Sequence, residues 1–244
     1  MTMKTLCMAA VAMAFSTYSH AVIVASDNGS NYGSGWTNGS NGGTGFDAWS
    51  ITTSGGGFKG NYLGNPSNIG VTGMGSTAFA LYANGGGGAT ITASRSFGAA
   101  LGIGDSFSMQ WGMNWDSDFG GNKGFNLFAG SSEVINVNNG GSALITVNGS
   151  DVGFGYGTNA MTWTFTQTTA TTVTVTANDR DGTGTYSAVI NVSGALSGLS
   201  IYASNMGSGG NREPFYNNFT IDAVPAPGAI ALLGLAGLAK RRRR

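Results

Sequence analysis

Apolar and polar residues alternate with a period of two along most of the chain. The clearest case is the stretch 106–115, where Phe107, Met109, Trp111, Met113 and Trp115 occupy every second position. Shorter alternations follow at 161–166, 172–176, 186–192 and 215–221. This period is typical of antiparallel strands that bury one face. The pattern therefore predicts an all-β body of roughly twelve short strands, with Trp111 and Trp115 in its core.

Turn-forming residues separate the alternating stretches. The run 178–184 (Asn-Asp-Arg-Asp-Gly-Thr-Gly) indicates a hairpin, and the runs 85–88 and 138–141 also indicate turns. The body shows no convincing helical period. We therefore predict a single antiparallel β-sandwich, a jelly roll of the lectin-like type, over residues 46–222. Residues 22–45 are rich in Gly and Asn, and we expect them to be a less structured leading segment.

The first 21 residues have the layout of a signal peptide. Lys4 precedes an apolar stretch at 6–15, and small residues lead to Ala21, after which we expect cleavage. The expected segment is helical. It contains the only Cys and the only His of the chain. The body without it has no disulfide, no thiol nucleophile, no His-based triad and no ordinary His/Cys zinc site.

Residues 223–244 have the layout of a second targeting signal, made of a Pro-containing motif, an apolar run and a basic end. The motif is Val224, Pro225, Ala226, Pro227 and Gly228, and the basic end is Lys240, Arg241, Arg242, Arg243 and Arg244. An apolar run of this kind predicts a short transmembrane helix whose basic end stays cytoplasmic. As a helix it would be about 18 Å long, against about 30 Å for a hydrocarbon core. The alternative is an amphipathic or core helix, but the run has no polar face, and a core helix would place four consecutive Arg against the core.

This arrangement resembles the PEP-CTERM sorting signal of Gram-negative bacteria. Val224, Pro225 and Pro227 match the motif, and Ala226 occupies the position where the family usually has Glu. The resemblance implies export through the secretion translocon, a transient stay in the inner membrane, and recognition by an exosortase-type sorting peptidase. It also implies display at the cell surface or in the extracellular polysaccharide matrix of a biofilm-forming cell.

The body carries a second resemblance. Segments 45–51, 78–82, 95–97 and 215–221 are similar to the skeleton of secreted concanavalin-A-like domains. That resemblance implies the same type of β-sandwich.

Charge divides unevenly between the body and the two ends. All eleven acidic residues lie between Asp27 and Asp222, whereas only five of the eleven basic residues do, so the body has a formal charge of −6. A mildly acidic body argues against binding to nucleic acid or to anionic lipid.

Two small sites are candidates. The first is a possible calcium site at Asn114, Asp116, Asp118 and Asn122, because oxygen ligands at alternate positions of a Gly-containing loop suit Ca²⁺. The alternative is an ordinary Asp/Asn-rich turn, since no further acid completes the set. The second is Trp36, which we expect to be exposed in the leading segment and able to stack on a sugar ring.

Catalytic residues are not evident in the body. Glu133 and Glu213 are the only glutamates, and neither lies in a paired-carboxylate motif of the kind that a glycosidase uses. The sequence therefore leads us to expect an exported protein that is not an enzyme, with no cofactor beyond the possible Ca²⁺. The alternatives are a carbohydrate-binding, lectin-like module and a glycosidase.

Overall fold

The computed structural model describes residues 21–33, 35–115, 121–178 and 184–225. Residues 21–224 form one compact unit. The predicted signal-peptide helix and the predicted C-terminal helix lie outside the described residues. Within the described part, no helix is long and apolar enough to cross a membrane.

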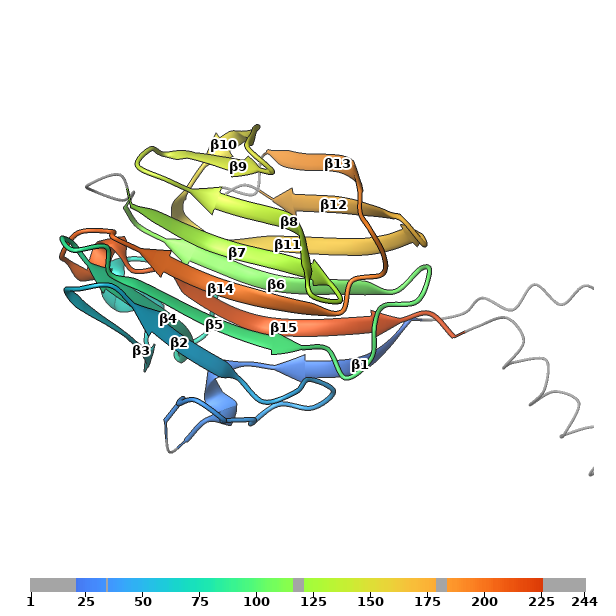
Figure 1. The fold of residues 1–244 in the computed structure, drawn as a ribbon, viewed down its shortest axis with the longest axis horizontal. Helices are drawn as coiled ribbons and strands as arrows, with labels where there is room; N and C mark the ends of the chain where they lie inside the picture. Colours follow the sequence, from blue (N-terminus) through green and yellow to red (C-terminus); the bar gives the residue numbers. More distant parts are fainter. Residues whose placement is uncertain (1–20, 34, 116–120, 179–183, 226–244) are drawn as a thin grey trace, which may run out of the picture. The chain divides into compact units, whose positions relative to one another are not determined.

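Fifteen antiparallel strands in two sheets make up the described fold (Figure 1). The eight-stranded sheet contains, in order, β13 (Thr185–Asn191), β12 (Thr172–Asn178), β11 (Gly157–Thr169), β6 (Ser106–Met113), β15 (Phe215–Ala223), β4 (Ala78–Asn84) and β3 (Phe58–Gly64), and β1 (Val22–Asp27) pairs with β15. The seven-stranded sheet contains β10 (Ser150–Gly155), β9 (Leu144–Val147), β8 (Ser132–Asn139), β7 (Asn122–Ala129), β14 (Gly198–Ser204), β5 (Thr90–Ser96) and β2 (Ser50–Ser54). Three short 3₁₀ helices are η1 (Gly29–Asn31), η2 (Pro66–Ile69) and η3 (Gly210–Arg212). The predicted all-β sandwich is confirmed.

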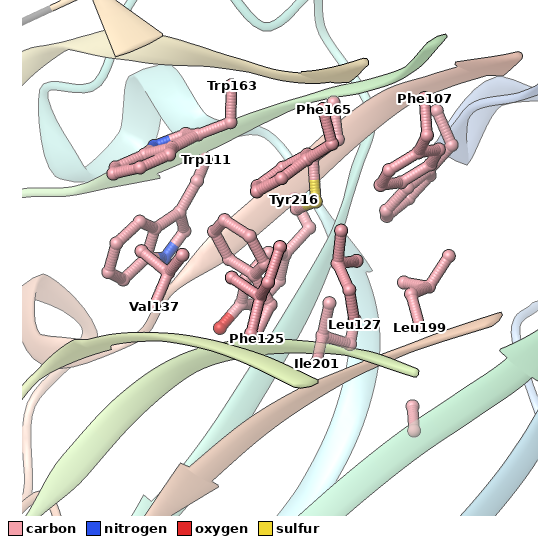
Figure 2. Close-up of a cluster of buried hydrophobic side chains, with 14 of the residues drawn as sticks. Phe107, Trp111, Phe125, Leu127, Val137, Trp163, Phe165, Leu199, Ile201 and Tyr216 are labelled. Carbon is pink, nitrogen blue, oxygen red and sulfur yellow. The ribbon is translucent and has the colours of Figure 1, made fainter. Parts of the chain in front are cut away.

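The core lies between the two sheets and is built from the residues that alternate along each strand. Figure 2 shows aromatic side chains of β6 and β11 above Phe125 and Leu127 of β7. Phe107, Met109, Trp111 and Met113 are all at most 1% exposed, as their period of two predicted. Edge-to-face contacts join the sheets: the Trp111 and Phe125 ring centroids are 5.6 Å apart.

Trp115 differs from the prediction. It is 49% exposed, although it continues the apolar stripe of β6. The reason is that β6 ends at Met113, so the alternation no longer directs the next apolar residue into the core. The prediction that Trp115 lies in the core was wrong.

Residues 22–45 also differ from the prediction, because they belong to the sandwich. Strand β1 pairs with β15 from Val22 opposite Ala223 to Asp27 opposite Phe219. Further along, Tyr32 is 5% exposed. The sandwich therefore begins at β1, and the expected boundary at residue 46 is wrong.

Two of the three predicted turns lie where the sequence indicated, whereas the run 138–141 begins inside β8, which extends to Asn139. β12 and β13 are antiparallel neighbours, with Asn178 opposite Thr185, so the run 178–184 connects a hairpin. The Gly-rich run 85–88 carries the chain from β4 in one sheet to β5 in the other. The chain changes sheets eight times between β1 and β15, and the two sheets pack face to face, so each has one inner and one outer face.

Candidate functional site

The outer face of the seven-stranded sheet carries mostly uncharged polar side chains, and we call it the polar face. Exposed Glu133, the cross-strand partner of Phe128, adds a carboxylate. The polar face takes every second residue from five adjacent strands. These are Ser50, Thr52 and Ser54 of β2, Thr90, Thr92, Ser94 and Ser96 of β5, Ser200, Tyr202 and Ser204 of β14, Asn122, Asn126 and Phe128 of β7, and Asn136 and Asn138 of β8. Two aromatic rings, those of Tyr202 and Phe128, stand among hydroxyl and amide groups.

Strand register aligns these side chains in rows across the sheet. One row runs Ser50, Ser94, Ser200, Asn126, Asn136, because each is the cross-strand partner of the next. Partners directly opposite each other in an antiparallel pair lie on the same side of the sheet. The rows therefore present hydroxyls on one half of the face and amides on the other.

Tyr202 lies at the centre of a hydrogen-bonded group of asparagines. The Asn136 amide donates to the Tyr202 hydroxyl at 2.9 Å, and that hydroxyl donates to Asn138 Oδ1 at 2.9 Å. The Asn136 amide also donates to Asn126 Oδ1 at 2.7 Å. Burial, as the main cause, raises the pKa of Tyr202 to about 12. Tyr202 is therefore neutral at physiological pH, and the group is a fixed array of neutral donors and acceptors.

Gly124 makes room for the Tyr202 ring. It is the cross-strand partner of Tyr202 on β7, and a Cβ at this position would lie 2.9 Å from the Tyr202 hydroxyl. The same Cβ would lie 2.0 Å from the Val137 carbonyl oxygen. Only glycine allows this close approach.

A groove of about 800 Å³ opens at one end of the polar face, and we call it the serine groove. Its floor comes from the end of β5, the start of β14 and the end of β7, with Ser94, Ser96 and Phe128 among its lining residues. Its wall is the segment Asp47–Ser50, which leads into β2.

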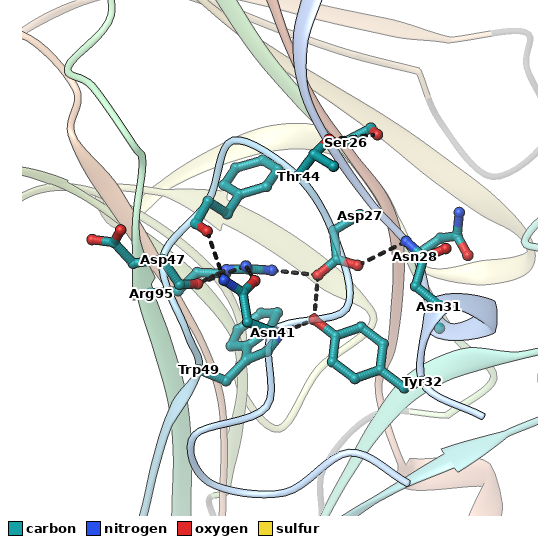
Figure 3. A network of polar contacts seen from close by, with 12 residues as sticks. Ser26, Asp27, Asn28, Asn31, Tyr32, Asn41, Thr44, Asp47, Trp49 and Arg95 are labelled. Carbon is teal, nitrogen blue, oxygen red and sulfur yellow. Dashed lines mark hydrogen bonds and ion pairs between the residues drawn. The ribbon is translucent and has the colours of Figure 1, made fainter. Parts of the chain in front are cut away.

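A buried ion pair holds this wall in place (Figure 3). The side chains of Arg95 and Asp27 contact each other with no exposed surface. Arg95 also donates from Nε to the Asp47 carbonyl at 2.9 Å and from Nη2 to Asn41 Oδ1 at 2.8 Å. One guanidinium therefore ties β1, β5 and the 41–47 segment together.

Aromatic groups complete the surroundings of the pair. The Tyr32 hydroxyl donates to Asp27 at 2.6 Å and accepts from Trp49 Nε1 at 3.0 Å. The guanidinium of Arg95 lies 4.7 Å and 4.8 Å from the ring centroids of Phe46 and Trp49. Burial, followed by the Asp27 hydrogen bond, raises the pKa of Tyr32. Because the guanidinium is committed to this interior network, it offers no positive charge to the serine groove.

The arrangement fits an uncharged, hydroxyl-rich ligand. Ser and Asn side chains can exchange hydrogen bonds with ligand hydroxyls, and the half-buried Phe128 offers an apolar surface beside them. Of the residues that line the groove, only Asp47 and Arg95 carry a charge, and Arg95 is neutralised internally. An anionic ligand would face the Asp47 carboxylate without a cationic partner.

Trp36 is not a surface platform. It is 3% exposed, and its ring packs edge-on against Trp49 and Phe79 with centroids 5.3 Å and 4.9 Å away. The expectation of an exposed Trp36 was wrong, because the leading segment folds back onto the core that β4 and the Asp27 network provide.

The calcium candidates are only partly described. Asp116 and Asp118 lie outside the described residues. Asn114 donates its amide to the Ile69 carbonyl at 2.5 Å, and Asn122 Oδ1 accepts from Asn138 at 3.1 Å. Within the described ranges no group of three or more His, Cys, Asp or Glu side chains could hold a metal. The calcium site stays a prediction.

The sandwich begins and ends at neighbouring points. Ala21 is the first described residue, and the next residue, Val22, pairs with Ala223. Val224, the first residue of the predicted sorting motif, donates its backbone N–H to Asp105 at 2.8 Å. The motif from Ala226 onward and the basic end lie outside the described residues.

Comparisons with known proteins give likeness to solved structures alone. No protein-family model matches the chain, and no curated protein does. Similar structures include the alginate lyase AlgAT5 from polysaccharide lyase family 7, at 8% identity and a TM-score of 0.37, over 55% of this chain and 76% of that one. The T. cruzi calreticulin globular domain is 10% identical with a TM-score of 0.46, over 90% of this chain and 95% of that one. An alginate lyase from Klebsiella pneumoniae is 10% identical with a TM-score of 0.38, over 57% of this chain and 82% of that one.

These matches correct one expectation. The sequence led us to expect a body that is not an enzyme, but two of the similar structures are alginate lyases, which are enzymes. The expectation that the body is not an enzyme is therefore withdrawn. Identities of 8–10% with TM-scores below 0.5 assign no activity to the chain in turn.

Proposed function

We propose that this chain is an exported β-sandwich of the lectin-like jelly-roll type that binds an uncharged polysaccharide through its polar face. The observation that carries the proposal is the chemistry of that face: hydroxyls, amides and two aromatic rings, in register across five strands, with a groove of about 800 Å³ at one end. Such convergent neutral groups suit a ligand whose own surface is mostly hydroxyl.

The charge distribution favours a neutral glycan over an acidic one. Asp47 is the one unneutralised charge that lines the serine groove, and it is negative. The body as a whole has a formal charge of −6. A polyuronate would therefore be repelled by the protein and would find no cation in the groove.

Export and display are the second half of the proposal, and sequence alone supports them. The signal-peptide pattern before Val22 and the sorting-signal pattern from Val224 would bring the sandwich to the cell surface or the polysaccharide matrix. There a neutral polysaccharide would be within reach. A sorting peptidase would act at the second signal.

A binding assay with matched variants tests the glycan half. Affinity electrophoresis of the full chain in gels containing a neutral glucan, a neutral galactomannan or alginate measures retardation by each polymer. We expect retardation by a neutral polymer and none by alginate. Phe128→Ala and Asn136→Ala should weaken retention about tenfold, which corresponds to 1.4 kcal/mol.

Thr174→Ala is the matched control, because Thr174 lies on the outer face of the other sheet, in β12. It should leave retention unchanged. Equal mobility of all variants in every gel would show that the polar face is not the binding surface.

Cell fractionation tests the display half. A chain lacking residues 224–244 should move from the cell envelope to the medium, because the proposed signal is missing. An unchanged distribution would count against a sorting function of this segment.

A further inference from the structure

A second cleft lies where β14 ends, and it is lined there by the first residue of β3 and the last residue of β4 from the eight-stranded sheet. It has a volume of about 580 Å³, and we call it the Phe58 cleft. Its lining residues are Phe58, Asn84, Gly85, Gly86, Asn205 and Ser208. Asn205 directly follows the last residue of β14, whereas the serine groove includes Gly198, the first residue of that strand. Figure 1 follows β14 from one end of the sandwich to the other.

Phe58 is an unusual residue to leave in solvent. It is the first residue of β3, and it is 81% exposed, the largest value among the exposed large apolar side chains in the described ranges. Its cross-strand partner is Asn84, so its position is set by the sheet rather than by a free loop. An aromatic ring held at the mouth of a polar cleft offers a flat apolar surface for a ligand.

Asn84 gives a second, independent indication of a ligand. Its Oδ1 is buried and has no hydrogen-bond partner among the described residues. A buried acceptor without a donor costs about 1–3 kcal/mol, so native structures rarely keep one. Rotation of the Asn84 amide toward the cleft would let a bound hydroxyl group donate to this oxygen while the sugar ring lies against Phe58.

The lining of the cleft again selects for a neutral ligand. All six lining residues are uncharged. Nearby Lys59 is occupied, because its ammonium donates to the Gly55 carbonyl at 2.7 Å. The cleft therefore has the same chemical preference as the serine groove.

We propose that the Phe58 cleft is a second sugar-binding subsite and that the ligand is a linear, uncharged polysaccharide chain long enough to reach both ends of β14. This inference rests on the proposed glycan-binding function. The seven residues of β14 span about 20 Å at roughly 3.3 Å per residue, which a single sugar ring cannot bridge. Simultaneous occupancy of two subsites by one chain raises affinity well above that of either subsite.

The experiment measures affinity against ligand length. The neutral polysaccharide that retards the full chain is hydrolysed to oligosaccharides of increasing length, and each is titrated calorimetrically against the wild type and Phe58→Ala. Val189→Ala is the matched control, because Val189 is also an exposed apolar strand residue, at 69% exposure, but lies on β13. Since Phe58 buries little surface, its variant should fold normally, which circular dichroism checks.

We expect affinity to rise steeply once the oligosaccharide can reach both subsites. Phe58→Ala should abolish that rise, with a loss of about tenfold or more for long chains and none for short ones. Val189→Ala should match the wild type at every length. Binding by the wild type together with a silent Phe58→Ala variant would overturn the second subsite and leave the proposed function intact. Absence of binding to any neutral oligosaccharide or polymer would overturn both.

Discussion

Replacement of Arg95 by methionine tests whether the buried ion pair holds the groove wall. The side chains of Arg95 and Asp27 have no exposed surface, so Arg95→Met leaves a carboxylate buried among neutral groups. Breaking a buried pair in this way costs about 3–5 kcal/mol. The hydrogen bonds to the Asp47 carbonyl and to Asn41 are lost as well. Against a typical domain stability of about 5–15 kcal/mol, the variant should fold with a much reduced margin.

Urea denaturation of the wild type and four variants measures the change in the free energy of unfolding. Arg95→Met and Asp27→Leu should each reduce the free energy of unfolding by about 3–5 kcal/mol. The double variant should lose less than the sum of the two, because no lone charge is left inside. Ser96→Ala is the neighbouring control, since Ser96 is exposed and should change stability by no more than about 0.5 kcal/mol. Glycan retention should fall in Arg95→Met, because the Asp47 wall loses its anchor.

Two results would refute this reasoning. One is an Arg95→Met variant whose unfolding free energy is within about 0.5 kcal/mol of the wild type, the ordinary range for a surface substitution. The other is strict additivity of the two single variants, which would mean that the two charges do not interact in the folded state.

Three further predictions address the core, a half-buried acid and the polar face. Trp111→Ala should cost about 3–5 kcal/mol, whereas Trp115→Ala should cost well under half of that, which thermal denaturation compares directly. Burial raises the pKa of the Glu213 carboxyl, so the folded wild type loses stability as the pH rises and this group ionises. Glu213→Gln cannot ionise and should therefore have a higher Tm than the wild type at pH 7. Near pH 4 the difference in Tm should vanish. Gly124→Ala, whose Cβ would clash with the Val137 carbonyl, should cost about 1–3 kcal/mol and weaken glycan retention; a silent variant would show that the sheet can yield there.

Local periodicity was enough to predict the core strands. The alternation in β6 and β12 is a property of consecutive residues, and the structure buries the apolar member of each pair. Trp115 shows the limit of the same rule. Its exposure depends on where β6 ends, which is at Met113. A period of two in the sequence therefore does not predict the residue at which a strand ends.

The leading segment could not be predicted because its order comes from distant partners. Trp36 is buried against Phe79, 43 positions away in the sequence, and Asp27 pairs with Arg95, 68 positions away. A Gly/Asn-rich composition says that local structure is weak, but not that long-range contacts are missing.

The polar face was visible in the sequence only in fragments. Thr90 to Ser96 and the Asn-Val-Asn run at 136–138 both alternate, and each could have been recognised as a strand with a polar side. Their placement on one face could not be, because β5 and β7 become neighbours of β14 only through the sheet order. Ser94 and Ser200 are cross-strand partners across more than a hundred residues.

The position of β15 links the last strand of the body to the integrity of the whole fold. On one side it pairs with β6, and on the other with β4 at its start and β1 along its end. Phe219 from β15 also packs its ring against Trp49 and Phe79. Until β15 is in place, β1 has no partner strand among the described residues, and the Asp27 network that starts from β1 cannot form.

Two truncations separate this role from that of the proposed sorting segment. A chain that ends at Pro214 should show no cooperative urea transition, because β1 and β6 lose their shared neighbour and the core loses Phe219. A chain that ends at Val224 should keep the wild-type transition, because Ala223 is the last paired residue of β15. Cooperative unfolding of the shorter chain would refute the central role of β15. A large loss of unfolding free energy in the longer chain would mean that residues beyond 224 contribute to the stability of the fold.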